Sequence, residues 1–390
     1  MVIIIFALKF VMPMSVIVWF AIIFYRGRFW RSDQYLSNVT SPLRELPKIV
    51  AIIPARNEQL NISQSVLSLL RQDYKGALYL IIVDDNSEDG TLKILGSISE
   101  GLDNIFVIEG KKTPIDWTGK TWAMAQGVEL AKKQFPDAKY YLFTDSDILH
   151  HRGNVTELVS KAMNENLALV SLMVKLRCIS IWEFLLIPAF IFFFQKLYPF
   201  SLVNNPKKSI AAAAGGCMLI DCKKLEKSGG LEVIKTEIID DCALAKNLKQ
   251  SNSIWIGLTK STKSLRSYSS LRDIARMVAR TAFVQLNYSI FNLFATIIGM
   301  LVIYTFPLMG LLIGILIGEI SLFVFGVMSL AMMFAAYIPT LKLYNRSIWE
   351  ACLLPIAAFI YTVMTVLSAW QYLYGDAPTW KGRSLAKVKK

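Results

Sequence analysis

The stretch IIVDDNSEDGT, residues 81–91, closes an apolar run and continues into a cluster of acidic and amide side chains. Three more apolar, β-rich segments lie nearby: KIVAII (48–53), NIFVIE (104–109) and KYYLFT (139–144). Stretches typical of helices separate them, near residues 60–72, 88–97 and 120–134. Strands that are apolar almost throughout and alternate with helices predict a parallel sheet covered on both faces. The pattern favours an α/β nucleotide-binding domain.

Polar residues follow three of these strands: PARNE (54–58), DDNSEDGT (84–91) and DSD (145–147). In open α/β sheets ligands bind outside the carboxyl ends of the strands, so these residues are expected to face a ligand. PARNE contains no G-x-G-x-x-G, which argues against a dehydrogenase. The two carboxylates of Asp145 and Asp147 suit a hard cation, Mg²⁺ or Mn²⁺, that shares its other positions with phosphate oxygens and water. The histidines at 150 and 151 are interpreted as helix-leading or surface residues rather than ligands.

The composition predicts a soluble domain joined to membrane segments, because 54% of the 390 residues are hydrophobic and 18% are charged. Apolar runs near 10–25, 289–318, 320–341 and 351–373 approach or exceed the roughly 20 residues that a membrane helix needs. We expect a retained N-terminal anchor over residues 1–28, rather than a cleaved signal peptide. C-terminal transmembrane helices are expected over residues 287–374.

Basic clusters, at residues 26–31 and 381–390, flank these segments. By the positive-inside rule, both clusters and the domain between them face the cytoplasm, which predicts a cytoplasmic domain at 30–285 and a basic cytoplasmic tail at 375–390. Three crossings after residue 288 would place that tail outside. Because Pro307 and two glycines interrupt the run at 289–318, it could form two short crossings or a re-entrant hairpin, and the count stays at four or five.

The net charge of +13 suggests nucleic acid first, but no nucleic-acid motif accompanies it. Much of the charge lies beside membrane segments, where it can meet anionic lipid, so the predicted partner is the bilayer and not nucleic acid. The five cysteines form no C-x-x-C pair, which predicts reduced thiols and neither a zinc site nor a disulfide framework.

Six ordered motifs resemble the inverting family 2 glycosyltransferases with a GT-A fold, over about residues 45–285. They are PARNE, VDDNSEDGT, GKTWAMAQG (119–127), FTDSD (143–147), GGCMLI (215–220) and DDCAL (240–244). LLIPAFIFFFQKLYPF (185–200), MVARTAFVQL (277–286) and WKGR (380–383) are similar to the branch associated with hopanoid biosynthesis in bacteria. The resemblance implies an α/β GT-A domain plus transmembrane helices in a bacterial inner membrane, a nucleotide-sugar donor, a Mg²⁺ or Mn²⁺ cofactor, and a membrane lipid acceptor, for which it points to a hopanoid.

The resemblance also implies roles for single residues. Asp145 and Asp147 hold the metal, Asp241 takes the position of the general base beside Asp240, and Glu237 is the alternative base if the register differs by a turn. The nucleotide-sugar-binding positions are Pro54, Arg56, Asn57, Glu58, Asp84, Asp85, Lys120, Asp145, Gly215, Gly216 and Arg280. Structural roles stay open for several of them: Asp84 could cap the next helix, the acidic pair could favour a helix N-terminus, and the glycines could simply form a turn.

The family's Q-x-x-R-W motif reads here as MVART (277–281), so only Arg280 is retained. This departure favours transfer of one sugar over processive polysaccharide synthesis. Residues 181–204 are predicted to form an interfacial helix on the membrane, with a buried core helix as the alternative. An inactive lipid- or glycan-binding scaffold and a transporter are the non-enzyme alternatives, and the sequence does not distinguish UDP from GDP donors.

Overall fold

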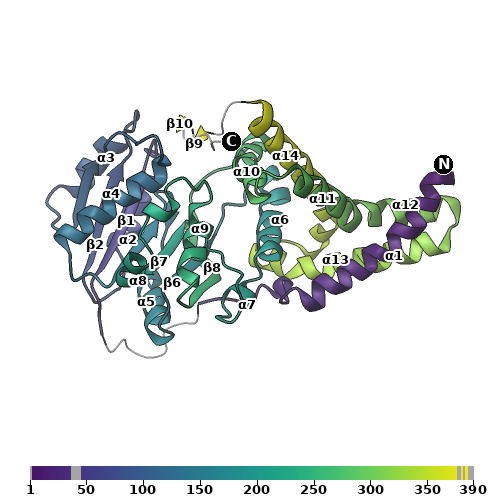
Figure 1. Ribbon diagram of the computed structural model, residues 1–390, viewed down its shortest axis with the longest axis horizontal. Coiled ribbons are helices and arrows are strands. Elements are labelled where there is room, and N and C mark those ends of the chain that lie inside the picture. Colours follow the sequence, from purple (N-terminus) through teal and green to yellow (C-terminus); the bar gives the residue numbers. More distant parts are fainter. Residues whose placement is uncertain (1, 37–44, 376–378, 381–382, 385–390) are drawn as a thin grey trace. The chain divides into compact units, whose positions relative to one another are not determined.

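The computed structural model describes residues 2–36, 45–375, 379–380 and 383–384, and the chain forms two units (Figure 1). The α/β unit comprises Asp33–Arg177, Leu202–Ser267 and Thr379–Lys390, and the helical unit comprises Met1–Ser32, Cys178–Ser201 and Tyr268–Pro378. Residues 178–201 and 268–285, inside the domain predicted at 30–285, therefore group with the helices. Most of the predicted tail at 375–390 lies outside the described residues.

The α/β unit is built on an eight-stranded sheet in the order β3-β2-β1-β4-β7-β6-β8-β5. Its strands are β1 (Ile49–Ala55), β2 (Leu78–Asp84), β3 (Ile105–Glu109), β4 (Tyr140–Thr144), β5 (Ile148–Leu149), β6 (Leu169–Lys175), β7 (Cys217–Asp221) and β8 (Ile254–Ser264). The four predicted strands, β1 to β4, are parallel, as expected. β7 then pairs antiparallel with both β4 and β6, so the complete sheet is mixed.

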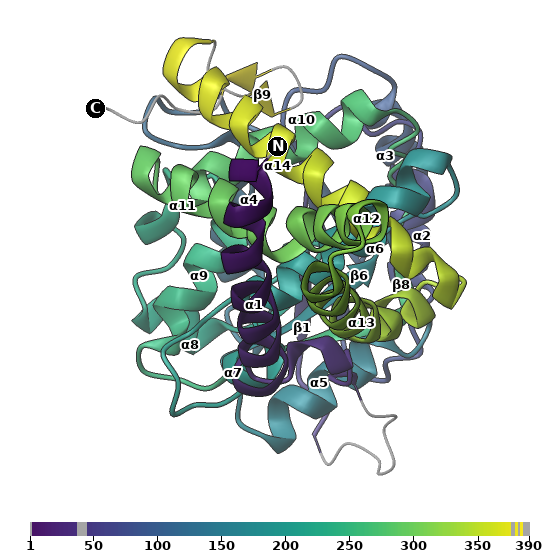
Figure 2. The same ribbon diagram turned by 90° about the vertical axis from the view of Figure 1, so that its right-hand side faces the viewer.

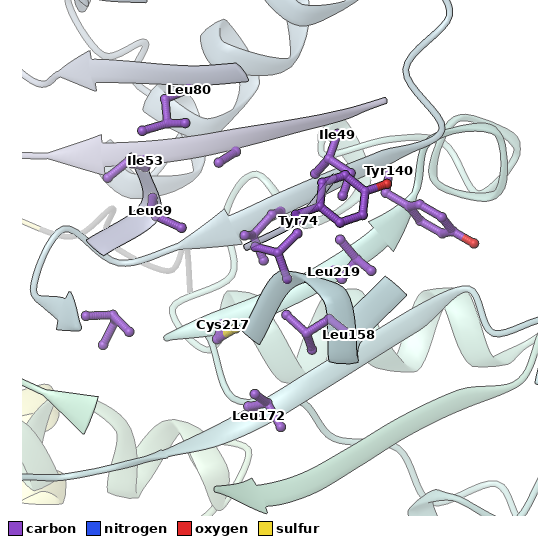
Figure 3. Packing of buried hydrophobic residues seen from close by; sticks show 14 of the residues in the cluster. Ile49, Ile53, Leu69, Tyr74, Leu80, Tyr140, Leu158, Leu172, Cys217 and Leu219 are labelled. Carbon is purple, nitrogen blue, oxygen red and sulfur yellow. The ribbon is translucent and has the colours of Figure 1, made fainter. Parts of the chain in front are cut away.

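The helices of this unit are α2 (Ile62–Leu70), α3 (Thr91–Ser99), α4 (Gly119–Gln134), α5 (Asn154–Asn164), α8 (Cys222–Lys227) and α9 (Asp240–Lys249). β1 is buried over its whole length, which explains its unbroken apolar sequence. Figure 3 shows part of the core, where Ile49, Leu80 and Leu219 of three strands pack with Leu69 of α2 and Leu158 of α5. α4 approaches the sheet closely, because a Cβ at Gly127 would lie 2.4 Å from Ile52.

The helical unit contains α1 (Val2–Tyr25), α6 (Ile181–Leu197), α10 (Leu271–Gln285), α11 (Ile290–Met300), α12 (Phe306–Ile317), α13 (Ile320–Leu343) and α14 (Leu354–Tyr374). The short helix α7 (Phe200–Val203) follows α6. Five stretches of the described chain are long and apolar enough to cross a membrane: Ile5–Tyr25, Ile181–Val203, Ile290–Ile317, Ile320–Leu343 and Ile348–Tyr374.

α12 and α13 form a tight hairpin, and α1 lies along it (Figures 1 and 2). A Cβ at Gly314 would lie 2.6 Å from the backbone nitrogen of Phe323, so the two helix backbones nearly touch. At the turn of the hairpin Lys9 pairs with Glu319 at 2.7 Å. We call the end of the hairpin away from this turn its open end. There α11 begins at Ile290 and α13 ends at Leu343.

The run at 289–318 is one helix, neither two short crossings nor a re-entrant hairpin. A π-helical segment, Leu301–Thr305, joins α11 to α12 just before Pro307. Proline has no N–H for the carbonyl four residues earlier, which is that of Ile303. The indole Nε1 of Trp19 on α1 donates to this carbonyl at 2.9 Å. A side chain from another helix therefore satisfies the group that the proline leaves unpaired.

α6 and α14 both have their two ends at the open end of the hairpin. Arg26, after α1, donates to the carbonyl of Leu197 at the end of α6, and Arg346, after α13, stacks over the ring of Phe184 near its start at 3.8 Å. α14 begins soon after α13 ends, and its Ser368 accepts from the Phe283 N–H of α10 at 3.1 Å. The Tyr361 hydroxyl of α14 donates to the Leu186 carbonyl of α6 at 2.9 Å, so these two helices touch midway.

Candidate functional site

The loops after β1 and β2 are joined by Arg56. Its Nη1 donates to the carbonyl oxygens of Asp85 at 2.7 Å and Asn86 at 2.8 Å, and its Nη2 pairs with Glu88 at 3.1 Å. Asn57, with a φ of 50°, accepts the Glu88 N–H at 2.8 Å. The structure thus places both predicted nucleotide-binding residues at the strand ends, where they hold the acidic loop in shape.

The remaining predicted residues of this region lie beside them. Asp84 accepts the N–H of Ser87 at 3.0 Å, so it closes the turn after β2. Asp85 is buried, and its N–H donates to the Ala55 carbonyl at 2.7 Å. Glu58 is also buried, and its carboxylate accepts from Asn61. Pro54 lies within β1, paired with Val83 of β2. Their contacts with a nucleotide stay a prediction.

Lys120 brings the second half of the predicted site together. Thr118 caps α4 by accepting the Thr121 N–H at 3.3 Å, which places Lys120 in the first turn of the helix. The Lys120 Nζ lies 2.8 Å from Asp145 Oδ1 and 3.6 Å from Asp240 Oδ2. Burial lowers the pKa of this ammonium group, but the surrounding carboxylates outweigh burial and raise the pKa above its ordinary value.

Asp240 and Asp241 are the first two residues of α9. Asp241 Oδ2 accepts the N–H of Gly215 at 2.8 Å, and Oδ1 accepts the N–H of Cys242 at 2.7 Å. Burial, followed by the charge of Asp240, raises the pKa of Asp241 to about 6, whereas Lys120 opposes the rise. Asp240 Oδ2 is buried and has no hydrogen-bond partner among the described residues. Besides standing in the first turn of α9, the acidic pair therefore contacts Gly215 and Lys120.

Gly215 occupies the point where these groups converge. A Cβ at this position would lie 3.1 Å from the Lys120 Nζ and 3.3 Å from Asp241 Oδ2, closer than side chains normally pack. Gly216 follows, and its carbonyl accepts the Asp145 N–H at 3.4 Å. The resemblance implies that these glycines bind the nucleotide-sugar, and this stays a prediction. The structure shows that Gly215 leaves room for the lysine and the carboxylate.

Asp145 directly follows β4, and its side chain is 38% exposed. Asp147 is buried, and its carbonyl accepts the Leu265 N–H at 2.8 Å. Across the residues that the structure describes, no three His, Cys, Asp or Glu side chains gather as a complete metal site. Two neighbouring carboxylates fit a hard cation that takes its other ligands from phosphate and water, as Mg²⁺ and Mn²⁺ do.

Of the two interpretations of His150, the surface position is wrong, because this side chain is buried in the loop that precedes α5. His151 is partly exposed and lies 3.2 Å from Glu157. Strand and helix periodicities predict burial only within strands and helices. Because His150 lies in a loop, no periodicity in the sequence could have predicted its burial. Glu237 is exposed and precedes α9. Arg280 lies on α10 of the helical unit, where its carbonyl accepts the Tyr372 hydroxyl, and its role toward a diphosphate stays a prediction.

Comparison with known proteins identifies a family domain that contains Lys120, Asp145 and Gly215 but ends before Asp240 and Asp241. The family model described as Glycosyl transferase family 2 matches residues 50–229. The chain is 37% identical over 86 residues to the "Probable glycosyltransferase YdaM" of Bacillus subtilis, covering 22% of this chain and 20% of that protein. It is 30% identical over 119 residues to the "Uncharacterized protein MJ0544" of Methanocaldococcus jannaschii, covering 30% and 48%. The chain thus spans about one fifth and about half of these two relatives.

Among solved structures, the chain is similar to the mannosyltransferase PcManGT from Pyrobaculum calidifontis, whose structure contains GDP-Man and Mn²⁺. The TM-score is 0.56 at 16% sequence identity, and the alignment covers 94% of this chain and 99% of that one. A likeness at this identity concerns the fold. Together with the family match, it confirms the predicted fold class: a GT-A-like domain with a mixed sheet, accompanied by apolar helices that could span a membrane.

Proposed function

We propose that this chain, whose residues 50–229 form a glycosyltransferase family 2 domain, transfers one sugar from a nucleotide-sugar donor to a hydroxyl group of a membrane lipid, with inversion. One observation carries the proposal. Lys120, in contact with Asp145 and Asp240, joins the acidic turn after β4 to the acidic start of α9. The groups that would hold the donor diphosphate and the group that would take the proton thus lie around one cation.

Asp241 is the proposed general base. With a pKa of about 6 it is ionised at neutral pH, and each carboxylate oxygen keeps a lone pair besides the one used by Gly215 or Cys242. The acceptor hydroxyl gives its proton to Asp241 as its oxygen attacks the anomeric carbon. The bond from that carbon to the diphosphate breaks on the opposite face, and the diphosphate leaves with the electron pair.

Asp145 and Asp147 would hold the divalent cation, Mg²⁺ or Mn²⁺. When bound, that cation supplies positive charge next to the leaving diphosphate. Lys120 already lies against Asp145 and adds a second positive charge for the same group. The similar protein PcManGT was solved with GDP-Man and Mn²⁺, which supports both the donor class and the metal. Arg280 and the strand-end residues from Pro54 to Asp85 keep their proposed roles toward the donor.

The helical unit supports an assignment to a membrane with three crossings: α1, the 290–317 helix and α13. α6 and α14 have both of their ends at the open end of the hairpin, so they would lie across that side of the bilayer. The parity problem of the sequence then disappears, because a chain that does not cross at α14 leaves its basic tail on the side of residue 288. We place that side in the cytoplasm of a bacterium.

This arrangement supports the proposal of a lipid acceptor. α6, within the predicted interfacial segment 181–204, is exposed only at its end residues Ile181 and Leu197 and is otherwise buried or partly buried in the helical unit. Lying across that side of the bilayer, it would border the level at which a lipid hydroxyl is available. A hopanoid is the proposed acceptor, on the resemblance of residues 185–200 and 277–286 to the hopanoid-associated branch. The loss of Gln and Trp around Arg280 favours a single transfer over a processive synthase.

The decisive experiment incubates membranes that contain the protein with a panel of labelled nucleotide-sugars, then extracts and separates the lipids. Membranes prepared with and without a hopanoid, and membranes that contain Asp241→Asn, are the matched controls. We expect one labelled, monoglycosylated lipid that requires the hopanoid and the intact carboxylate. A labelled polymer would identify a processive synthase, and unchanged donor in every reaction would identify a binding scaffold.

A further inference from the structure

A buried chain of hydrogen bonds lies beneath the acidic turn, and the proposed chemistry does not use it. His150, Thr144 and Asn154 are all buried in the α/β unit. The imidazole Nε2 of His150 lies 3.0 Å from the Thr144 hydroxyl oxygen, and its Nδ1 lies 2.9 Å from the Asn154 Nδ2. The Thr144 hydroxyl is in turn 2.8 Å from the Gly216 carbonyl.

The direction of each hydrogen bond follows from the chemistry of the end groups. Gly216 offers a carbonyl oxygen, which only accepts, so the hydroxyl hydrogen of Thr144 points toward it. The Thr144 oxygen must then accept from His150, and Nε2 carries the ring hydrogen. Nδ1 is left as an acceptor, which matches the amide donor of Asn154. With the amide nitrogen facing Nδ1, the Asn154 oxygen faces the Thr262 hydroxyl and accepts from it at 3.0 Å.

The ring is also held and kept neutral. The His150 N–H donates to the Ser68 hydroxyl at 3.0 Å, which anchors its backbone to α2. Burial, together with the neighbouring His151, lowers the pKa of His150 to about 3, so the ring carries a single hydrogen near neutral pH.

This series of hydrogen bonds ends at Gly216, which lies at the junction between the two halves of the proposed active site. The Gly216 carbonyl accepts both from Thr144 and from the Asp145 N–H, and the preceding Gly215 N–H donates to Asp241. We propose that His150 is a positioning residue, an inference that rests on the proposed transferase function. Through Thr144 it holds Gly216, so that the turn that carries Asp145 and the Gly215–Gly216 segment that contacts Asp241 keep one relative position.

The first test is independent of turnover. The chain has two histidines, so ¹⁵N-histidine labelling gives two ring systems, and His151→Gln assigns them. We expect His150 to show a hydrogen on Nε2 and a bare Nδ1, unchanged between about pH 5 and pH 8. A hydrogen on Nδ1, or protonation of the ring within that interval, would overturn the proposal.

The second test compares three variants. His150→Leu removes the ring donor, and His150→Gln keeps an N–H donor at a similar reach. Leu158→Ala is the control, because it removes buried methyl groups from α5 and Leu158 is not part of the series of hydrogen bonds. For His150→Leu we expect kcat to fall by about 10- to 10²-fold, with the donor KM at saturating metal within roughly threefold of wild type. His150→Gln should recover most of the loss. Leu158→Ala, compared at a temperature where both variants are folded, should keep kcat close to wild type.

Binding of Mn²⁺ alone, followed by the electron paramagnetic resonance of the free ion, supplies a readout without a donor. His150→Leu should weaken it several-fold, and His150→Gln should weaken it less. A His150→Leu protein with wild-type kcat and wild-type Mn²⁺ binding would show that the residue positions nothing. If no donor supports turnover even in wild type, the proposed function fails, and the ring tautomer and Mn²⁺ binding still decide whether His150 holds the turn.

Discussion

The pH dependence of transfer should respond in opposite directions to two substitutions next to Asp241. If Asp241 must be ionised, the rate falls about tenfold for each pH unit below its pKa. Lys120→Met removes a positive charge that lowers this pKa, so activity should disappear at a higher pH than in wild type. Asp240→Asn removes a negative charge that raises it, so activity should persist to a lower pH.

The size of the first shift can be worked from the position of Gly215. Its Cβ would lie 3.1 Å from the Lys120 Nζ and 3.3 Å from Asp241 Oδ2, so the two charges are at most about 6.4 Å apart. At that separation their attraction is about 0.6 kcal/mol at the dielectric constant of water and about 2.6 kcal/mol at an effective value of about 20. One pKa unit corresponds to about 1.4 kcal/mol, and 6.4 Å is the largest separation. Lys120→Met should therefore raise the pKa by at least about half a unit with the screening of water, and by at least about two units at an effective dielectric constant of about 20.

The assay is kcat/KM for sugar transfer between about pH 4.5 and pH 9, at saturating Mn²⁺ in buffers of equal ionic strength. In wild type the acid limb should lie near the Asp241 pKa. The bound metal ion also shifts this pKa, but by the same amount in every variant, so the comparison between variants is unaffected. Lys120→Met will also lose rate, because Lys120 faces Asp145, so the prediction concerns the position of the limb and not its height. Acid limbs that move in the same direction in both variants, or that stay fixed in both, would refute Asp241 as the titrating base.

Asp241→Asn keeps the shape of the side chain but cannot accept a proton, so transfer should fall by ~10²–10⁴ while donor binding, measured by calorimetry, persists; a near-wild-type rate, with Glu237→Gln inactive instead, would move the base to Glu237. EDTA should abolish transfer and Mg²⁺ or Mn²⁺ should restore it, and Asp147→Ala should reproduce the chelated state; a fully active Asp147→Ala enzyme would contradict the metal assignment. For topology, Ile320→Cys should react with an impermeant maleimide in intact cells, whereas Cys352 should react only after lysis. Labelling of Cys352 in intact cells would reverse the proposed orientation of α13.

The sequence predicted those parts of the fold that depend on patterns among neighbouring residues. β1, β2 and β4 are buried apolar runs with polar residues directly after them, so their existence and the edge they share follow from periodicity. The antiparallel strand β7 between β4 and β6 had no such signal, because its neighbours are far away in the sequence. Only its glycine pair was predicted, through the family resemblance.

The candidate site divides in the same way. The motifs predicted Asp145, Asp240 and Asp241 as separate acidic groups, but not that Lys120 would contact two of them. His150 was misjudged because the polar partners that make its burial possible, Thr144 and Asn154, are ordinary residues whose contacts arise from folding. A buried imidazole with both nitrogens paired has no signature in a single sequence.

The contact between Trp19 and Ile303 has a consequence for how the protein is made. In the bilayer an unpaired carbonyl costs several kcal/mol, because no water is present to bond it. If α1 and the 290–317 helix cross the membrane as proposed, the helix synthesised first carries the donor for a carbonyl that leaves the ribosome 284 residues later. α1 must therefore stay in the bilayer while the α/β unit is translated, and only then can the later helix complete its backbone hydrogen bonding. α1 thus supplies the hydrogen-bond donor that a later helix of the same unit needs in order to satisfy its backbone.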